Sequence, residues 1–269
     1  MRPATLVARR RSGARQFFRF FLAASAFSAF AISILPLPAL AAEDWYTGAS
    51  KTAPSDDWIV AVDASTTYTS NKSQFANIGS TIALDGRTLA QTGTRLRLEG
   101  LAGTYAYADP ATGQQIHGQQ FQGGLLVGYE KIYKNASIAG YVGVDIRDNS
   151  LSTVDINNST VGTTAGVKAV AEAYLQPTDL TMFSAYASYS TAHDAYYARV
   201  RAGYRVFDNG YVGPELTFLG DEYFGQSRIG AHLSGLQLAA FQLGISGGYG
   251  RDRFNKGGYY ATLDARTGF

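Results

Sequence analysis

The stretch Tyr259-Tyr260-Ala261-Thr262-Leu263-Asp264-Ala265-Arg266-Thr267-Gly268-Phe269 decides the fold. Successive side chains of an extended chain point to opposite faces, so residues two apart share a face. One face carries Tyr259, Ala261, Leu263, Ala265, Thr267 and Phe269, and the other carries Tyr260, Thr262, Asp264, Arg266 and Gly268. An apolar face that alternates with a charged face is typical of a β-strand with only one side in water.

Eleven further runs with the same period precede this stretch. They lie near residues 58–68, 74–84, 95–105, 120–130, 138–147, 161–176, 180–190, 196–206, 212–221, 224–233 and 241–249. Many reach the length of about 9 to 11 residues with which a strand crosses a bilayer, whereas ordinary strands have ~5–6. No stretch after residue 41 has 18 uninterrupted apolar residues, so a membrane helix is not expected there.

Two all-β folds explain this alternation. In a periplasmic β-sandwich the apolar faces pack against each other, and in a membrane barrel they face lipid. A terminal Phe269 on an alternating strand resembles the C-terminal assembly signal of outer-membrane barrels, and single-chain bacterial barrels have an even number of strands. We therefore expect an antiparallel, up-and-down transmembrane β-barrel of about twelve strands, closed by its last strand and surrounded by lipid of the cell outer membrane.

The N-terminal region has the features of a signal peptide. Six arginines and no acidic residue flank an apolar run over 20–40, and Ala39-Leu40-Ala41 forms a small-x-small cleavage site. A retained membrane helix is the alternative, but Pro36 and Pro38 interrupt the run and favour removal. We expect a cleaved signal peptide over residues 1–41, a short periplasmic segment over 42–57 and the barrel over 58–269.

Composition and charge narrow the range of functions. Cleavage after Ala41 leaves 228 of the 269 residues, with 17 basic and 21 acidic side chains and a formal net charge of −4. The basic character of the whole chain therefore comes from the signal peptide and gives no reason to expect nucleic acid as a partner. The absence of cysteine excludes disulfides and thiolate metal sites, and no cofactor motif is present.

The lengths of the connections between the runs predict which end of the barrel faces the periplasm and which faces the outside of the cell. Bacterial barrels have short periplasmic turns and longer outside loops, and both chain ends are expected in the periplasm. The expected short turns are 131–135, 177–179, 208–210 and Ser234-Gly235, and the expected outside loops are 108–117, 148–160, 190–195 and 251–256. Two connections depart from this rule, because 71–73 is a short outside loop and 85–92 is a long periplasmic turn.

The charged faces of the runs are expected to meet in the lumen. Besides Asp63, Asp145, Arg147, Asp264 and Arg266, the lumen-lining candidates are Arg95, Arg97, Glu99, Tyr141, Lys168, Glu172, Arg199, Arg201, Arg205, Glu215 and Arg228. Charges of both signs favour either a mesh of ion pairs that fills the lumen or a lining for a polar solute. Arg199, Arg201 and Arg205 repel one another unless acids such as Glu215 on the next strand oppose them.

Tyrosines on the same faces suggest a saccharide as the polar solute. The inward positions include Tyr105, Tyr107, Tyr141, Tyr174, Tyr186 and Tyr260. Tyrosine rings stack on sugar rings and their hydroxyls bond to sugar hydroxyls. The alternative is that the tyrosines near strand ends belong to an interfacial aromatic girdle.

A lipid-modifying enzyme is a further alternative. Such an enzyme needs a His beside a Ser and a carboxylate, and the chain has only His117, His193 and His232. Ser190 and Asp194 are close to His193 in sequence, and Ser234 is close to His232, but neither set has the signature of a catalytic triad. We therefore do not expect catalysis.

Short motifs throughout residues 57–249 resemble one known family. They are Asp57-Trp58, Leu96-Arg97-Leu98-Glu99-Gly100, Gly203-Tyr204 with Asp208-Asn209-Gly210, Gly213-Pro214-Glu215, and Gly247-Gly248-Tyr249. The chain is similar in these places to the cellulose biosynthesis protein BcsS family. The resemblance implies a non-enzymatic outer-membrane accessory to the biosynthesis, export or surface anchoring of cellulose or another β-glucan. It also implies the cellulose synthase and export machinery as partners. A small-solute porin is the alternative from another class.

Overall fold

The computed structural model describes residues 57–109, 112–207, 209–253 and 257–269, which belong to one compact unit. The expected signal peptide and residues 42–56 lie outside this part of the chain. The described residues form twelve β-strands and one short 3-10 helix, and no helix among them is long and apolar enough to cross a bilayer.

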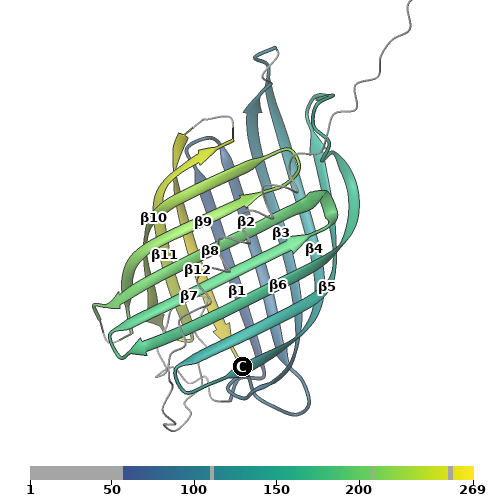
Figure 1. The fold of residues 1–269 in the computed structure, drawn as a ribbon. Coiled ribbons are helices and arrows are strands. Elements are labelled where there is room, and N and C mark those ends of the chain that lie inside the picture. Colours follow the sequence, from purple (N-terminus) through teal and green to yellow (C-terminus); the bar gives the residue numbers. More distant parts are fainter. Residues whose placement is uncertain (1–56, 110–111, 208, 254–256) are drawn as a thin grey trace, which may run out of the picture. The chain divides into compact units, whose positions relative to one another are not determined.

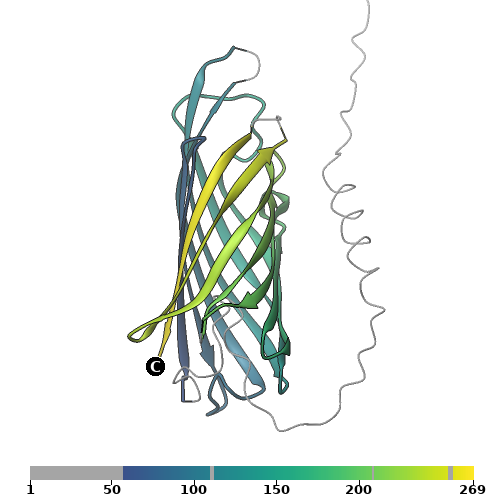
Figure 2. The same cartoon turned by 90° about the vertical axis from the view of Figure 1, so that its left-hand side faces the viewer.

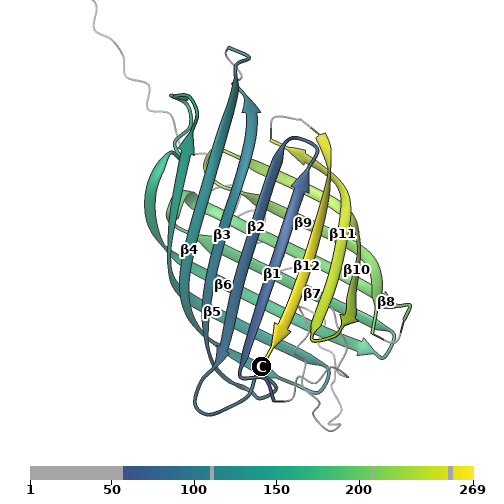
Figure 3. The same ribbon diagram turned by 180° about the vertical axis from the view of Figure 1, so that it is seen from behind.

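Each strand pairs antiparallel with the next in the sequence, and β12 returns to β1, so the sheet closes into a barrel (Figures 1 and 3). The strands are β1 (Val60–Thr69), β2 (Ser73–Ala83), β3 (Gly93–Ala108), β4 (Gln115–Ile132), β5 (Ala136–Leu151), β6 (Gly162–Thr178), β7 (Thr181–Ser190), β8 (Ala195–Arg205), β9 (Tyr211–Gly220), β10 (Gly225–Leu238), β11 (Phe241–Asp252) and β12 (Gly257–Gly268). The 3-10 helix η1 (Ala192–Asp194) connects β7 to β8. The predicted number of strands and the up-and-down topology are confirmed.

The last strand closes the barrel as expected. Asp63 of β1 faces Arg266 of β12, and Thr69 faces Tyr260. At the end of this seam the backbone N–H of Phe269 donates to the carbonyl of Val60 over 3.0 Å. Closure leaves no unpaired strand edge, which is the condition for placing β-structure in lipid.

The barrel has two different ends (Figure 2). The end that holds the start of β1 and the end of β12, here called the turn end, carries the connections 84–92, 133–135, 179–180, 206–210 and 239–240. The opposite end, here called the loop end, carries the connections 70–72, 109–114, 152–161, 191–194, 221–224 and 253–256. The two exceptional connections predicted from the sequence are therefore real, with 70–72 at the loop end and 84–92 at the turn end.

One predicted turn is wrong. Ser234 and Gly235 do not end a strand but lie inside β10, where the register with β11 shifts between Ser234 and Leu236. Gly235 has a φ of +84° there, a conformation that glycine adopts without steric cost. The strand continues past this bulge and reverses at Ala239 and Ala240. A bulge glycine and a turn glycine look alike in sequence, which is why the interpretation failed.

The two faces of the sheet have opposite polarity. Large apolar side chains such as Phe121, Val142, Val144 and Leu263 stand on the outside, each about half exposed. Charged side chains are buried inside, and Asp264 is completely inaccessible to solvent. A β-sandwich buries its apolar faces, so this distribution excludes the sandwich and corresponds to a barrel with a lipid-facing exterior.

Candidate functional site

Ion pairs cross the barrel interior between β3 and β6. The guanidinium of Arg97 lies 2.6 Å from the carboxylate of Glu172 and 2.7 Å from that of Glu99, and Lys168 also pairs with Glu99. Because β3 and β6 are not neighbours in the sheet, the bonds from Arg97 to Glu172 and from Lys168 to Glu99 run across the interior. They connect opposed parts of the wall.

A second set of ion pairs connects β8 and β9 with β12. Arg201 lies 2.6 Å from Glu215 and 2.7 Å from Asp264, and Arg199 lies 3.1 Å from Asp264. The hydroxyl of Tyr260 donates to Glu215 over 3.0 Å. Glu215 therefore opposes Arg199 and Arg201 as the sequence indicates, while Asp264 is a partner that sequence spacing does not reveal.

We call these two sets the ion-pair floor. It comprises Arg97, Glu99, Lys168, Glu172, Arg199, Arg201, Glu215 and Asp264. All are buried except Glu99, which is half-buried. Buried charges are tolerated only when they are paired and hydrogen-bonded, and every member of the floor meets an opposite charge.

The long connection between β2 and β3 packs against the barrel at the turn end. Its residue Leu89 is buried against Trp58, Ala61 and Ala83, and the Leu89 N–H donates to the carbonyl of Trp58 over 2.7 Å. We call Trp58 and residues 84–92 the turn-end cap. The alternation that runs from Trp58 through Val60 and Val62, opposite Asp63, predicts an outward Trp58. This prediction is wrong, because the cap folds over the Trp58 ring and leaves it 7% exposed.

Arg95 ties this cap to the barrel wall. Its guanidinium lies 2.9 Å from Glu130 on β4 and donates to the carbonyls of Leu89 and Gln91 in the cap. Arg95 is completely buried. The unusual length of the 84–92 connection is therefore explained by its position over the turn end.

The structure places all eleven lumen-lining candidates inside the barrel, in different surroundings. Eight are buried, and Glu99, Arg205 and Arg228 are half-buried. Arg205 donates to the Tyr211 hydroxyl over 3.0 Å, and Arg228 donates to Gln226 over 2.7 Å. Tyr141 lies under the guanidinium of Arg97, whose carbon is 5.6 Å from the ring centre.

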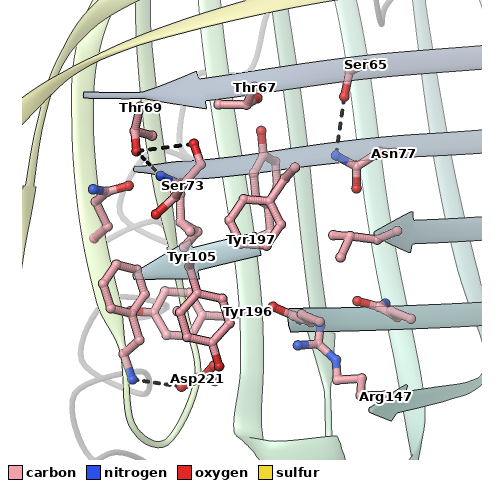
Figure 4. Close-up of a pocket in the computed structure, with 18 of the residues that line it drawn as sticks. Ser65, Thr67, Thr69, Ser73, Asn77, Tyr105, Arg147, Tyr196, Tyr197 and Asp221 are labelled. Carbon is pink, nitrogen blue, oxygen red and sulfur yellow. Dashed lines mark hydrogen bonds between the residues drawn. The ribbon is translucent and has the colours of Figure 1, made fainter. Parts of the chain in front are cut away.

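Above the floor, toward the loop end, a cavity of about 510 Å³ occupies the interior (Figure 4). Arg97, Glu99, Lys168 and Arg199 form its inner end. Its walls combine aromatic rings with hydroxyl and amide groups, among them Phe75, Tyr105, Tyr107, Tyr186, Tyr196, Tyr197, Ser65, Thr67, Asn77 and Gln122. We call this space the loop-end cavity.

The tyrosines divide between this cavity and the buried interior. Tyr105, Tyr107 and Tyr186 line the cavity, whereas Tyr141, Tyr174 and Tyr260 are buried among other side chains and do not line it. Tyr197 shares the face of Arg199 on β8 and lines the cavity, but it is not among the tyrosines predicted to face inward.

Tyr196 departs from simple alternation. Alternation on this strand puts Tyr196 on the face opposite Arg199 and therefore predicts an outward ring, but Tyr196 lines the cavity together with its neighbour Tyr197. Gly220 on β9 is its partner in the register, and a Cβ at Gly220 would lie only 2.8 Å from the Tyr196 hydroxyl oxygen. Because Gly220 has no side chain, there is room for the Tyr196 ring. This pairing of Tyr196 with a glycine cannot be recognised before the register of β8 and β9 is known.

Hydrogen bonds at the loop end bring three segments together. The hydroxyls of Tyr107 and Tyr223 donate to the Asp155 carboxylate over 2.7 and 3.0 Å, and Asn158 donates to Tyr107 over 3.2 Å. Asp155 and Asn158 belong to the 152–161 connection, and Tyr223 belongs to the 221–224 connection. We call these four residues the rim latch.

The rim latch perturbs its own ionisable groups. Burial raises the pKa of Asp155, but the hydrogen bonds from Tyr107, the Asn157 backbone and Tyr223 outweigh it and hold that pKa below its ordinary value. Burial and the hydrogen bond to Asp155 raise the pKa of Tyr223 to about 12. Asp155 is therefore held as a carboxylate at neutral pH.

The three histidines do not form a triad with the residues close to them in sequence. His117 is exposed on β4, His193 is buried in η1, and His232 is buried on β10. The Ser190 hydroxyl donates to Asp145 over 2.6 Å instead of pairing with His193. His232 bonds to Ser234 and to the carbonyl of Ala202. In the described part of the chain no group of three His, Cys, Asp or Glu is arranged to hold a metal.

Fold and interior together define a class of protein, a closed antiparallel barrel with an apolar exterior, an interior crossed by ion pairs and a cavity toward one end. Within this class the identity of the chain follows from its sequence. The family model of cellulose biosynthesis protein BcsS matches residues 62–269, and the chain belongs to that family. The resemblance noted on short motifs is therefore confirmed.

Solved structures with a similar arrangement are all distant in sequence. A KdgM porin is 11% identical, with a TM-score of 0.42, and the match covers 78% of this chain and 99% of the porin. The transport unit of the autotransporter AIDA-I from Escherichia coli is 8% identical, with a TM-score of 0.44, and covers 92% of this chain and 97% of that one. Comparison with curated proteins gives no match.

Proposed function

We propose that this protein is an outer-membrane barrel that retains β-glucan at the cell surface as an accessory to cellulose biosynthesis, and that it neither conducts solutes nor catalyses a reaction. The family supports the association with cellulose. The observation that carries the mechanism is the ion-paired interior, in which the ion-pair floor and the turn-end cap lie on the turn-end side of the cavity. We infer that together they close the lumen.

The exterior supports placement in a bilayer. Leu125, Val127, Val142 and Val144 on neighbouring strands β4 and β5 are each about half exposed and offer an apolar surface to lipid. The turn end faces the periplasm in this proposal, because bacterial barrels keep their short connections there. The loop-end cavity then faces the outside of the cell.

The sealed interior argues against the porin alternative. A porin needs a continuous water-filled path, and its wall charges face that water. Here Arg97 on β3 reaches Glu172 on β6, three strands away, and Arg201 on β8 reaches Asp264 on β12, four strands away. A solute that enters from the loop end meets these pairs and then the turn-end cap.

The arrangement of the histidines argues against the enzyme alternative. A hydrolase or acyltransferase needs a His that is bonded to a nucleophile and oriented by an acid, in a place that the substrate reaches. The His232 ring bonds to Ser234 and to a backbone carbonyl, and it is only 2% exposed. His117 stands alone on the outer face of β4 and forms no comparable set.

Two experiments test the proposal. Purified barrel in a planar bilayer is expected to show conductance near zero, with a known porin as the positive control, and steady porin-like channels would contradict the sealed interior. Deletion of the gene is expected to lower the cellulose that stays with the cells and to raise the amount shed into the medium, with restoration by the wild-type gene. Unchanged cell-associated cellulose would overturn the role in retention.

A further inference from the structure

We propose that the loop-end cavity binds the terminus of a neutral β-glucan chain end-on, and not a segment from the middle of the polymer. This inference rests on the proposed function for the identity of the polymer. Beyond the proposed function, the inference says that the chain end is the part of the polymer that binds and that the loop-end cavity is the binding site.

The cavity is walled on every side. Its lining comes from strands around the whole barrel, including Thr67 of β1, Asn77 of β2, Tyr105 of β3, Arg147 of β5, Ser188 of β7 and Tyr197 of β8. A groove that binds a polymer along its length must be open at both ends. A well that is enclosed by a closed sheet offers no second opening through the wall.

The inner end of the well is lined by charged side chains. Arg97, Glu99 and Arg199 line it and are at the same time held in the ion-pair floor. A chain that enters from the loop end therefore stops at the floor. The volume of about 510 Å³ is within the range of roughly 300–1,000 Å³ that is typical of small-ligand pockets. The cavity accordingly holds a few sugar units and not a continuous strand.

The lining has the chemistry of a sugar site. Tyr105 and Tyr107 lie with ring planes 15° apart and centres separated by 6.2 Å, and Tyr186 and Tyr197 meet edge to face at 5.7 Å. Such rings offer apolar faces for the C–H surfaces of a pyranose and hydroxyls for its polar edge. Asn77, Gln120 and Gln122 add amide groups that both donate and accept.

The charge pattern favours a neutral glycan. The cations at the inner end are committed to carboxylates, since Lys168 and Arg97 pair with Glu99 and Arg199 pairs with Asp264. At the inner end an anionic sugar would have to break these pairs to gain a cation, and Arg228 in the cavity wall already donates to Gln226 and lies over the ring of Tyr260. A glucose unit bonds to paired charges without displacing them.

The first test measures binding of cello-oligosaccharides of increasing length to the detergent-folded full barrel by calorimetry. End-on binding in a blind well predicts that affinity per molecule rises over the first few units and then stays constant. Binding along a groove predicts that affinity per molecule continues to grow with length, because longer chains offer more registers. Continued growth, or no binding at all, would overturn the inference.

The second test changes the number of ends at constant mass of polymer. Insoluble cellulose is partly cut with an endoglucanase, and the capture of the barrel is compared with the number of newly formed chain ends. We expect the capacity to rise in proportion to the ends. A capacity that follows total mass, or tighter binding of an oligouronate than of a cello-oligosaccharide, would contradict end-on recognition of a neutral glucan.

A matched pair of variants on one strand locates the site. Tyr197→Ala removes a ring from the cavity, and Tyr204→Ala removes an outward ring that is 55% exposed on the same strand β8. Loss of one aromatic contact is expected to weaken cello-oligosaccharide binding by roughly two- to tenfold, and the control is expected to bind like wild type. Equal cello-oligosaccharide binding by wild type and both variants would show that the cavity is not the binding site.

The outcomes separate this inference from the proposed function. Shed cellulose in the deletion strain, together with a barrel that binds no oligosaccharide, would refute the end-on site and leave the retention role. Normal cell-associated cellulose, together with length-limited oligosaccharide binding, would refute the retention role and leave the site. The length series uses wild-type protein, so it does not depend on the folding of a variant.

Discussion

At the scale of single residues, the interior is stabilised by pairing and not by apolar packing. Arg201 contacts two carboxylates and Asp264 contacts two guanidinium groups, all in positions that water hardly reaches. Charges in such places are costly when alone, so each member of the floor depends on its partners. The pairs with Asp264 cross the interior between strands that are not neighbours in the sheet.

Removal of one floor cation is therefore expected to destabilise the barrel. Arg201→Ala leaves Glu215 and Asp264 with one fewer buried cation, which costs roughly 3–5 kcal/mol when a buried pair is broken. Arg251→Ala on the exposed surface is the control, with an expected change within about 0.5 kcal/mol. Urea unfolding in lipid vesicles measures both, and equal stability of the two variants would contradict the importance of the floor.

Protonation of Asp155 is expected to release the rim latch. Because the folded-state pKa of Asp155 is below its ordinary value, its contribution is complete above about pH 4 and is lost as the pH falls through the lowered value. Hydrogen exchange in residues 152–161, corrected for intrinsic rates, is therefore expected to increase only below about pH 4. Asp155→Asn is the control and is expected to lose this pH dependence. A wild-type loop that opens between pH 7 and 5 would show that another group is responsible.

At the scale of secondary-structure elements, local departures from regular strands shape the interior. The 84–92 connection folds back as the turn-end cap, and the bulge at Gly235 lets β10 continue beyond the point where its sequence suggests a turn. A bulge inserts an extra residue and increases the local twist of the strand. His232 and Ser234, which bond to each other, immediately precede this glycine.

The bulge is expected to require glycine. Gly235→Ala forces a left-handed backbone on a residue with a Cβ, at a cost of roughly 1–2 kcal/mol. Gly140→Ala on β5 is the matched control, since a Cβ there meets open space. The midpoint of unfolding, followed by the heat-dependent mobility shift on a gel, distinguishes the two. A Gly235→Ala barrel as stable as the control would mean that the bulge relaxes at no cost.

At the scale of the whole molecule, polarity is inverted relative to a water-soluble protein. The buried set is dominated by charged and hydroxyl side chains, and the exposed set contains Phe121, Ile146 and Leu263. A closed sheet with this distribution is stable only if its exterior is removed from water. The family, the fold and the polarity therefore agree on a membrane setting.

An arginine placed on the outer face tests whether the barrel lies in a bilayer and how deep a given position is in it. Val144→Arg, near the middle of β5, is expected to destabilise the folded barrel in vesicles by roughly 2–4 kcal/mol, the cost of arginine at the bilayer midplane. Val161→Arg, next to the loop-end start of β6, is expected to cost only about 0–1 kcal/mol. Equal destabilisation by the two variants would contradict the proposed positions of Val144 near the bilayer midplane and Val161 near its edge.

Much of the fold follows from the order of residues in the chain. The number of strands, the closure by β12 and the inward positions of Arg97, Glu172 and Arg201 can be read from alternation, because any strand has a side-chain period of two. The predictions that proved wrong concern residues at which the regular two-residue alternation of a strand does not apply. Trp58 precedes the first strand, and Ser234-Gly235 lies in a bulge, so neighbours and not the period decide their environment.

Apart from Trp58 and Tyr196, the sequence by itself determined which side chains face inward and which face outward, because within a regular strand that choice depends on local backbone geometry. Only the tertiary structure decided which inward side chains meet. Asp264 is 63 residues from Arg201 and four strands away along the sheet, and closure of the barrel brings them within 2.7 Å. The ion-pair floor, and the cavity above it, exist because the closed sheet sets distances across the interior that no spacing along the chain encodes.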